Sequence, residues 1–231
     1  LDLFFTLNVG PGPRDESGDW IPDNSRELME YAVDRGDPVV MWELGNEING
    51  FLLAHGSILS AEDYANDLAT ARALVDDVAP SALLTGPSSA YWPEIGDMTS
   101  FYPTFMPLGG HLLDAVTWHY YPMQSHRCPV VSRSAGPEVM LDPVNLDEVH
   151  IWSDEVEGLA AEHAPGVPVW LGESGNAQCG GEPGVSDTWA GTFWWLDQLG
   201  LLAMRGQPVV VRQTLSRSDY GLVDDVTMEP N

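Results

Sequence analysis

Short apolar runs alternate along this chain with segments patterned as helices, and this alternation limits the fold more than any other feature. Six runs are predicted as buried strands, at residues 3–7, 39–44, 83–85, 112–119, 167–171 and 209–212. Apolar strands joined by helices are typical of a parallel sheet covered on both faces. The alternation by itself permits two α/β architectures, an open doubly wound sheet and a (β/α)8 TIM barrel.

Cap and turn residues place the ends of several elements. One helix is predicted to begin at Asn24 or Ser25 and to end at Gly36, and another to begin at the capping-box-like Ser60. Gly86-Pro87 predicts the end of the third strand. Later helices are predicted around residues 149–159 and 186–205. A long loop at 122–143 and a glycine-rich loop at 175–184 precede them.

The charge balance disfavours one class of partner. The chain has 35 acidic residues against 9 basic ones, all arginine, for a formal net charge of −26. Such a field repels polyanions, so nucleic acid is not expected as a partner. No run of 18 apolar residues occurs, so no membrane span is predicted. No glycine-rich phosphate loop follows a predicted strand, which weakens the nucleotide-binding alternative, and no cofactor is expected.

Only two cysteines, Cys128 and Cys179, are present, each in a loop after a different predicted strand. Two cysteines are too few for a disulfide scaffold, and no zinc-ligand spacing occurs, so no metal site is predicted. One disulfide between the two loops and two free thiols are both open alternatives.

Two glutamates at strand ends are the strongest candidates for catalytic chemistry. Glu47 closes Trp-Glu-Leu-Gly-Asn-Glu at 42–47, and Glu173 closes Trp-Leu-Gly-Glu at 170–173. Each is predicted to follow its strand directly, so that in a barrel both would project into the mouth. Two carboxyl groups about 5–5.5 Å apart can cleave a glycosidic bond with retention, and Asn46 offers an amide to the sugar 2-hydroxyl. In so acidic a chain, either glutamate could also be an ordinary surface residue.

Other polar residues near the strand ends have two interpretations each. His119 could donate a hydrogen bond to a carboxylate or be a satisfied buried residue. Gly180 and Gly181 could offer backbone N–H groups to a carboxylate or could form a plain turn. Glu43 is predicted to be a buried structural carboxylate, with Arg212 as its partner.

Together these motifs resemble glycoside hydrolase family 79, the heparanase and β-glucuronidase family. The likeness covers nearly the whole chain and is densest at the predicted strand ends. The matching segments are 42–47 with Asn49 and Phe51, 116–119, 170–173, 186–190, 195–197, 199–201, Val210, Arg212-Gln213, Tyr220 and 222–224.

The resemblance implies a role for each candidate. Glu47 would be the acid/base and Glu173 the nucleophile of a retaining mechanism, while Asn46 would contact the sugar 2-hydroxyl. Tyr121 would lie near the nucleophile, with Tyr120 as the alternative. The donor-sugar pocket would be lined by Gln213.

In the family, a uronic carboxylate is held by a Tyr-Gly-Gly backbone stretch after the nucleophile and by a tyrosine after the last strand. That tyrosine matches Tyr220. The stretch matches Gln178-Cys179-Gly180, so two of its three positions depart from the family. Backbone donors survive substitution, so carboxylate binding is still expected. Tyr91-Trp92, after the third predicted strand, resembles a stacking platform for a sugar.

The resemblance also implies a (β/α)8 TIM barrel, of which residues 1–231 would be a part. At 231 residues the chain is shorter than the roughly 250 of a complete barrel. It would hold the third to eighth strands, with the first two strands and a C-terminal β-sandwich domain outside it.

The predicted activity is retaining hydrolysis of β-linked glucuronides in an oligosaccharide or glycoconjugate. The alternatives are hydrolysis of neutral β-glycans and a non-catalytic carbohydrate-binding barrel. Family members are commonly exported or lysosomal, so an extracellular, periplasmic or lysosome-like location is expected. The sequence leaves the oligomeric state open.

Overall fold

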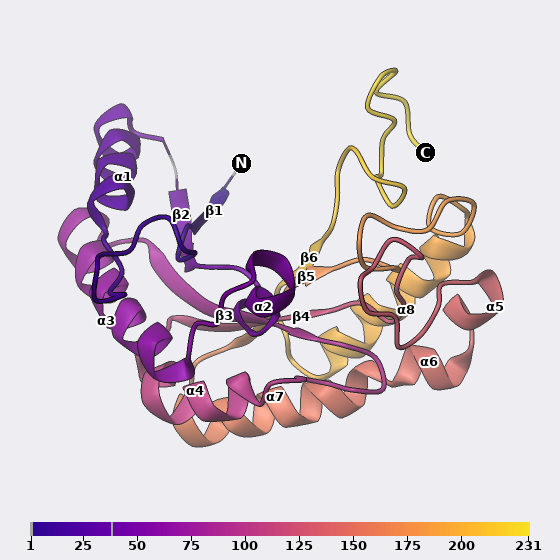
Figure 1. The fold of residues 1–231 in the computed structure, drawn as a ribbon. Helices are drawn as coiled ribbons and strands as arrows, with labels where there is room; N and C mark the ends of the chain where they lie inside the picture. The colour runs from indigo at the N-terminus through magenta and orange to yellow at the C-terminus, as the bar shows by residue number, and fades with distance from the viewer. Residues whose placement is uncertain (1, 38) are drawn as a thin grey trace. The chain divides into compact units, whose positions relative to one another are not determined.

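The computed structural model describes residues 2–37 and 39–231 (Figure 1). Six strands form one sheet, in the order in which they occur in the chain. The pairs β1–β2, β2–β3 and β5–β6 are parallel. The strands are β1 (Leu3–Leu7), β2 (Val39–Leu44), β3 (Leu83–Tyr91), β4 (Ala115–Tyr120), β5 (Val169–Ser174) and β6 (Val210–Arg212).

A helix lies in every connection between consecutive strands, which confirms the predicted alternation. No helix among the described residues is long and apolar enough to cross a bilayer. The helices are α1 (Asp23–Arg35), η1 (Ile48–Gly50), α2 (Phe51–His55), α3 (Ala61–Val78), α4 (Phe101–Gly109), η2 (Gly110–Leu112), α5 (Pro137–Met140), α6 (Pro143–Asp147), α7 (Val149–His163) and α8 (Ala190–Met204).

The chain divides into two compact units. The first unit comprises Leu1–Ser89, Thr99–Thr117 and Gly158–Val169. The second comprises Ala90–Met98, Trp118–Glu157 and Trp170–Asn231.

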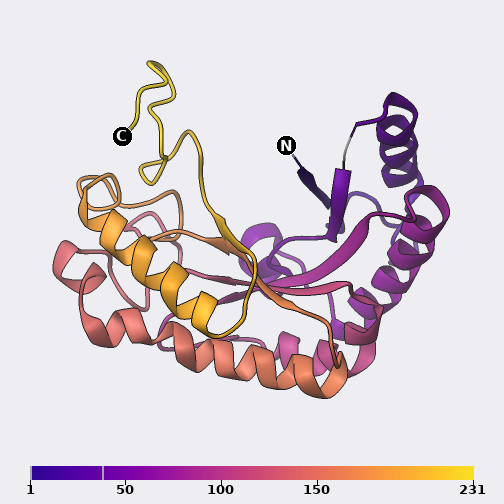
Figure 2. The ribbon, with the colours of Figure 1, turned by 180° about the vertical axis from the view of Figure 1, so that it is seen from behind.

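In the first unit, α3 follows the predicted pattern. The Ser60 hydroxyl accepts a hydrogen bond from the Asp63 backbone N–H, as a helix N-cap should. Tyr64, Leu68, Ala71, Val75 and Val78 recur at helical spacing along one face of this helix, and the first four are fully buried while Val78 is half-buried. The helix packs beside α1, as Figures 1 and 2 show.

The predicted start of α1 is wrong by one or two residues. The helix begins at Asp23, directly after Pro22, so Asn24 and Ser25 lie in its first turn. Its predicted end is confirmed, because Gly36 adopts the left-handed backbone conformation at φ 71° that favours glycine at this position.

The predicted end of the third strand at Gly86-Pro87 is also wrong, because β3 continues to Tyr91. Gly86 serves packing rather than a turn. A Cβ atom there would lie 2.6 Å from the hydroxyl of Tyr64, which donates to the Leu44 carbonyl oxygen over 2.8 Å. The glycine thus makes room for a side chain of α3 that bonds to β2.

The second unit has its own apolar cluster, formed by Met123, Met140, Ala177 and Trp194. Helix α8, orange in Figure 2, packs on β5, where the Gln198 side-chain amide donates to the Ser174 hydroxyl over 2.7 Å. This helix begins at Ala190 rather than at the predicted residue 186. The four preceding residues form turns, in which the Gly191 N–H bonds to the Thr188 carbonyl oxygen.

Candidate active site

Glu47 lies in a tight turn that follows β2. Gly45 permits the turn through a φ of 75°, and a Cβ atom there would lie 2.4 Å from Val9. Glu47 itself has a left-handed φ of 48° and donates its backbone N–H to the Ser88 carbonyl oxygen over 3.0 Å. A non-glycine residue rarely adopts this conformation. The turn and its bond to β3 therefore hold Glu47 at a defined place, half-buried, with Asn46 exposed before it.

Glu43 is a buried structural carboxylate, as predicted, but its predicted partner is wrong. Its oxygens accept hydrogen bonds from the hydroxyl groups of three threonines on neighbouring strands, at 3.0, 3.4 and 3.5 Å for Thr117, Thr85 and Thr6. The parallel register pairs Glu43 with Thr6 on one side and with Thr85 on the other. Hydroxyl donors thus satisfy this carboxylate in place of an arginine.

Arg212 instead lies over the rings of Trp194 and Trp195, with its guanidinium carbon 5.6 and 5.2 Å from the ring centres. Burial lowers the pKa of Arg212. Its side chain belongs to the contact between β6 and α8, which a cation–π interaction stabilises.

Glu173 is the fifth residue of β5 and not the first residue after it, which corrects its predicted position. The hydroxyl of Tyr121 donates to its Oε1 over 2.6 Å. A ring nitrogen of His119, which is buried in β4, lies within 4.8 Å of a carboxylate oxygen of Glu173. The strand and the Tyr121 hydrogen bond hold the carboxylate in one orientation.

Tyr220 and Gly175 complete the surroundings of Tyr121. The rings of Tyr121 and Tyr220 have centres 6.4 Å apart, and Tyr220 is buried. A Cβ atom at Gly175 would lie 2.8 Å from the Tyr121 ring and 3.3 Å from the Tyr220 ring. The Gln213 backbone N–H bonds to the Ser174 carbonyl oxygen over 2.8 Å, so the half-buried Gln213 follows β6 next to the end of β5.

The choice between Tyr120 and Tyr121 is settled in favour of Tyr121 by the bond to Glu173. Tyr120 is packed inside the unit, with its ring centre 6.2 Å from that of Trp118. Burial and the nearby charge of Glu148 raise the pKa of Tyr120 well above its usual value. The two neighbours on the chain thus have different environments.

The predicted stacking platform at Tyr91-Trp92 is wrong, because both side chains are buried. The Tyr91 ring packs against those of Trp118 and Trp152, with centres 5.7 and 6.0 Å apart. Its hydroxyl donates to Glu155 over 3.2 Å. These rings form part of the buried core of the second unit.

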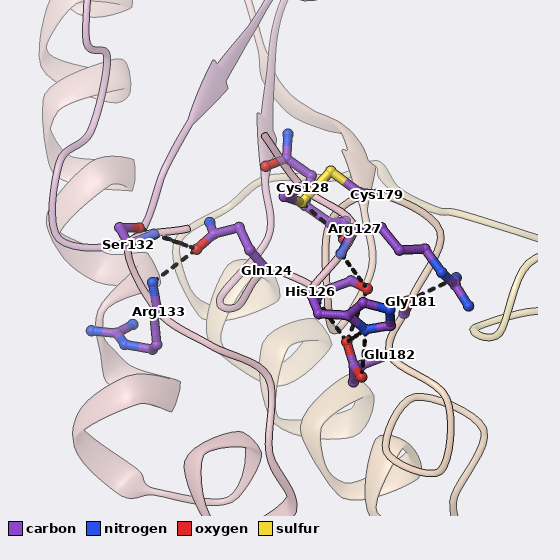
Figure 3. Close-up of a disulfide and its surroundings, with 11 residues drawn as sticks. Gln124, His126, Arg127, Cys128, Ser132, Arg133, Cys179, Gly181 and Glu182 are labelled. Atoms are coloured by element: carbon purple, nitrogen blue, oxygen red, sulfur yellow. Dashed lines mark hydrogen bonds and ion pairs between the residues drawn. A yellow bond between two sulfur atoms is a disulfide. The ribbon is translucent and has the colours of Figure 1, made fainter. Parts of the chain in front are cut away.

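The loop after β5 retains a glycine-like backbone. Cys179, Gly180 and Gly181 have φ values of 66°, 87° and 83°. Cys179 is joined to Cys128 by a disulfide, so the bridged alternative is the correct one (Figure 3). The Gly181 N–H is already donated to the Ala177 carbonyl oxygen over 3.1 Å.

The second unit thus brings together most of the predicted sugar-binding residues, namely His119, Tyr121, Glu173, Gly180, Gly181, Gln213 and Tyr220. Glu47 and Asn46 belong to the first unit, and their meeting with Glu173 around one ligand stays a prediction. Gly175 was not predicted, although its place two residues after Glu173 was a signal for close approach of a ring.

Relatives of this chain are found among curated proteins. Heparanase of Gallus gallus is 34% identical over 210 residues, which are 89% of this chain and 38% of that protein. Heparanase-like protein 1 of Arabidopsis thaliana is 32% identical over 220 residues, 93% of this chain and 38% of that protein. Inactive heparanase-2 of Homo sapiens is 26% identical over 234 residues, 100% of this chain and 37% of that protein. The chain spans 37–38% of the length of these relatives.

Solved structures share the fold. An α-L-arabinofuranosidase from Thermotoga maritima aligns with a TM-score of 0.67 at 14% identity, over 95% of this chain and 44% of its own. A 4-O-α-L-rhamnosyl-β-D-glucuronidase from Fusarium oxysporum aligns with a TM-score of 0.60 at 18% identity, over 98% of this chain and 47% of its own.

These alignments and the parallel sheet identify the fold as a partial (β/α)8 barrel. The model of the glycosyl hydrolase family 79 N-terminal domain matches residues 4–200. The chain belongs to glycosyl hydrolase family 79.

Proposed function

We propose that the protein to which this chain belongs is a retaining glycoside hydrolase that cleaves β-linked glucuronides. The observation that carries the proposal is the 2.6 Å hydrogen bond from Tyr121 to Glu173, in a family whose members include heparanases. A strand-borne carboxylate held by a tyrosine hydroxyl is fixed for attack on an anomeric carbon. Membership of the family supports the chemistry, and the local geometry supports Glu173 as the nucleophile.

In the proposed mechanism, Glu47 protonates the glycosidic oxygen while Glu173 attacks the anomeric carbon. The carbon–oxygen bond to the leaving group breaks, and a glycosyl ester forms on Glu173. Glu47 then takes a proton from water, which attacks the same carbon and releases the sugar with its original configuration. Tyr121 holds the carboxylate of Glu173 before the first step, and Asn46 contacts the 2-hydroxyl. This mechanism requires the two carboxyl groups to lie about 5–5.5 Å apart.

The proposed selectivity for a uronic acid rests on the loop after β5 and on Tyr220. The positive φ values of Cys179 and Gly180 keep this backbone in a conformation that glycine favours, although one of the residues is a cysteine. A backbone N–H group can donate to a carboxylate whatever its side chain is. Because Gly181 already donates to Ala177, Gly180 is the proposed donor, together with the buried Tyr220.

Two alternatives have a specific observation each. The residues Gln178 and Cys179 depart from the Tyr-Gly-Gly of the family, which favours a neutral β-glycan as substrate. The similarity to inactive heparanase-2 favours a carbohydrate-binding protein without turnover. The presence of both glutamates and of the Tyr121 bond supports a hydrolase over the non-catalytic alternative.

We further propose that the substrate is a glucuronide-containing oligosaccharide or glycoconjugate and that the protein works outside the cytosol. The Cys128–Cys179 disulfide supports this location, because disulfides persist mainly in oxidising compartments.

The test is hydrolysis of 4-nitrophenyl β-glucuronide and β-glucoside by the full-length protein. We expect the glucuronide to be the better substrate by kcat/KM, with a product of β configuration by NMR before mutarotation. Preference for the glucoside would favour the neutral-glycan alternative. Binding of either sugar without turnover would favour the binding protein.

A further inference from the structure

The segment 125–128 lies in one of the three loops that carry candidate sugar-binding residues of the second unit, and it contacts the other two. It belongs to the loop after β4, which begins with Tyr121. It is tied to the loop after β5, which carries Gly180, and to the loop after β6, which carries Tyr220. We name residues 125–128, with their partners Cys179, Glu182 and Asp219, the loop clamp. Figure 3 labels His126, Arg127, Cys128, Cys179 and Glu182 of the loop clamp.

The first tie is covalent. Cys128 and Cys179 form a disulfide between residues 51 positions apart in sequence. Next to it, the Gln178 N–H donates to the Met123 carbonyl oxygen over 2.9 Å, and the Ser125 N–H donates to the Gln178 carbonyl oxygen over 3.1 Å. The loops after β4 and β5 therefore run as a short parallel pair, closed by the disulfide.

The second tie is centred on Glu182. Its carboxylate accepts hydrogen bonds from the Ser125 hydroxyl over 2.9 Å and from the His126 N–H over 2.8 Å, and the His126 ring lies 2.9 Å away. The backbone N–H of His126, and then its ring, lower the pKa of Glu182. Glu182 directly follows Gly180 and Gly181 in the chain, so these hydrogen bonds hold the loop after β4 against that part of the loop after β5.

The third tie reaches the loop after β6. Arg127 forms an ion pair with Asp219 over 2.6 Å and also donates to the Gly181 carbonyl oxygen over 3.3 Å. The Asp219 backbone N–H donates a hydrogen bond to the Gly180 carbonyl oxygen over 2.8 Å. Gly181 fits only without a side chain, because a Cβ atom would lie 2.9 Å from the Tyr220 nitrogen. The three loops are thus held in contact at Gly180, Gly181 and Tyr220.

The disulfide compensates for a backbone that the cysteine disfavours. Cys179 has a φ of 66°, in the left-handed region that a residue with a Cβ atom adopts less readily than glycine. The disulfide restricts the chain conformations that are available to residue 179, and so helps to keep it in the left-handed region. Without it, residue 179 is free to leave the left-handed region, and the Gly180 N–H would turn away from its present direction.

We propose that the loop clamp sets the specificity of this protein for a uronic acid, by positioning the Gly180 N–H and Tyr220 around the carboxylate of the donor sugar. Cys128, Cys179 and Arg127 are positioning residues in this account and do not touch the sugar. The inference rests on the proposed function, and it adds that this specificity depends on the oxidised state of the disulfide.

The test compares the oxidised full-length protein with its reduced form and with the C128S/C179S double variant. We expect KM for 4-nitrophenyl β-glucuronide to rise between about 10- and 100-fold, with little change in kcat, because the carboxylate contact is misplaced while Glu173 and Tyr121 stay in place. Amide hydrogen exchange of residues 178–181 and 219–221 should become faster. Reductant should change neither KM nor the amide hydrogen exchange of the double variant.

Arg127→Ala should also raise KM for 4-nitrophenyl β-glucuronide, because the third tie is lost. Arg26→Ala is its matched control, because Arg26 of α1 is similarly exposed and forms an ion pair over 2.7 Å with Asp77 of α3. Unchanged KM and unchanged exchange after reduction would overturn the inference and leave the proposed function standing. Absence of glucuronide turnover in the oxidised wild type would contradict the proposed function instead. In that case the clamp would be tested by amide hydrogen exchange alone, and unchanged exchange after reduction would overturn it.

Discussion

The Tyr121 hydroxyl donates a 2.6 Å hydrogen bond to Oε1 of Glu173, and the two residues lie at the ends of the neighbouring strands β4 and β5. This bond connects a tyrosine that no helix or strand contains with a carboxylate that is fixed in a strand. It defines the direction in which the carboxylate points, and it is the geometric basis of the first prediction.

Tyr121→Phe should lower kcat on aryl β-glucuronide by about 10- to 100-fold, since a hydrogen bond to a charged group contributes about 1.5–3 kcal/mol. KM should change little, because the ring remains against Tyr220. The measurement is steady-state kinetics with circular dichroism to verify folding. Tyr31→Phe, on the exposed face of α1, is the control, and equal activity of both variants would contradict the assignment.

Gly175→Ala should reduce activity as strongly as the loss of the tyrosine hydroxyl. The new methyl group would lie 2.8 Å from the Tyr121 ring and 3.3 Å from the Gln213 carbonyl oxygen, so the ring must move away from Glu173. Gly158→Ala is the control, because no atom lies within 4 Å of its Cβ position. That control should leave kcat unchanged, and wild-type kcat for Gly175→Ala would show that Tyr121 tolerates displacement.

Thr117→Val should destabilise the full-length protein by about 1.5–3 kcal/mol, because it removes a donor to the buried Glu43 carboxylate. The Ser88 N–H would also lose its acceptor, now 3.2 Å away. Urea unfolding followed by tryptophan fluorescence measures the change. Thr70→Val, at an exposed position of α3, should stay within about 0.5 kcal/mol of wild type. A similar small effect at Thr117 would show that Glu43 does not need this donor.

Glu157→Gln should reduce stability in a way that depends on pH. Burial alone would raise the pKa of Glu157, but hydrogen bonds from Arg205, Gln207 and Ser153 outweigh it and lower the pKa below its usual 4.5. The stabilisation that the ionised Glu157 carboxylate provides is therefore complete above its unfolded-state pKa. It is lost as the pH falls through the folded-state pKa. At pH 7 the variant should be less stable by about 1–2 kcal/mol, with allowance for partial exposure.

Urea unfolding of wild type and Glu157→Gln at several pH values between neutral and acidic tests this sign. The difference between the two proteins should shrink as the solution becomes more acidic. Glu162→Gln, on the exposed side of α7, should show no such difference at any pH. A gap for Glu157→Gln that stays constant into acid would contradict the pKa direction.

Local patterns predicted the elements well where local chemistry determines them. Strands β1 and β2 have the predicted bounds, Ser60 caps α3, and Gly36 ends α1. Each of these depends on residues within a few positions of each other, so the sequence alone contains the information.

Other features depend on residues brought together only by the fold. Gly86 looked like a turn residue, and its role appears only with Tyr64 packed against it. The sequence predicts a charged partner for Glu43, whereas three threonines on separate strands donate to it in the fold. The disulfide was one of two open alternatives for the same reason. The strand-end motif suggests Glu173, and the family resemblance suggests Tyr121 with Tyr120 as the alternative, but only the structure shows which tyrosine bonds to the carboxylate.

The most direct test of the central claim is identification of the residue that becomes glycosylated. The full-length protein would be incubated with a 2-deoxy-2-fluoro-β-glucuronyl fluoride, which forms the glycosyl ester but hydrolyses it slowly, and then digested for mass spectrometry. We predict one added sugar, attached to Glu173 and absent in Glu173→Gln, with Glu47→Gln slowing both labelling and release. Labelling of a different carboxylate, or turnover of aryl glucuronide by Glu173→Gln at the wild-type rate, would contradict the account.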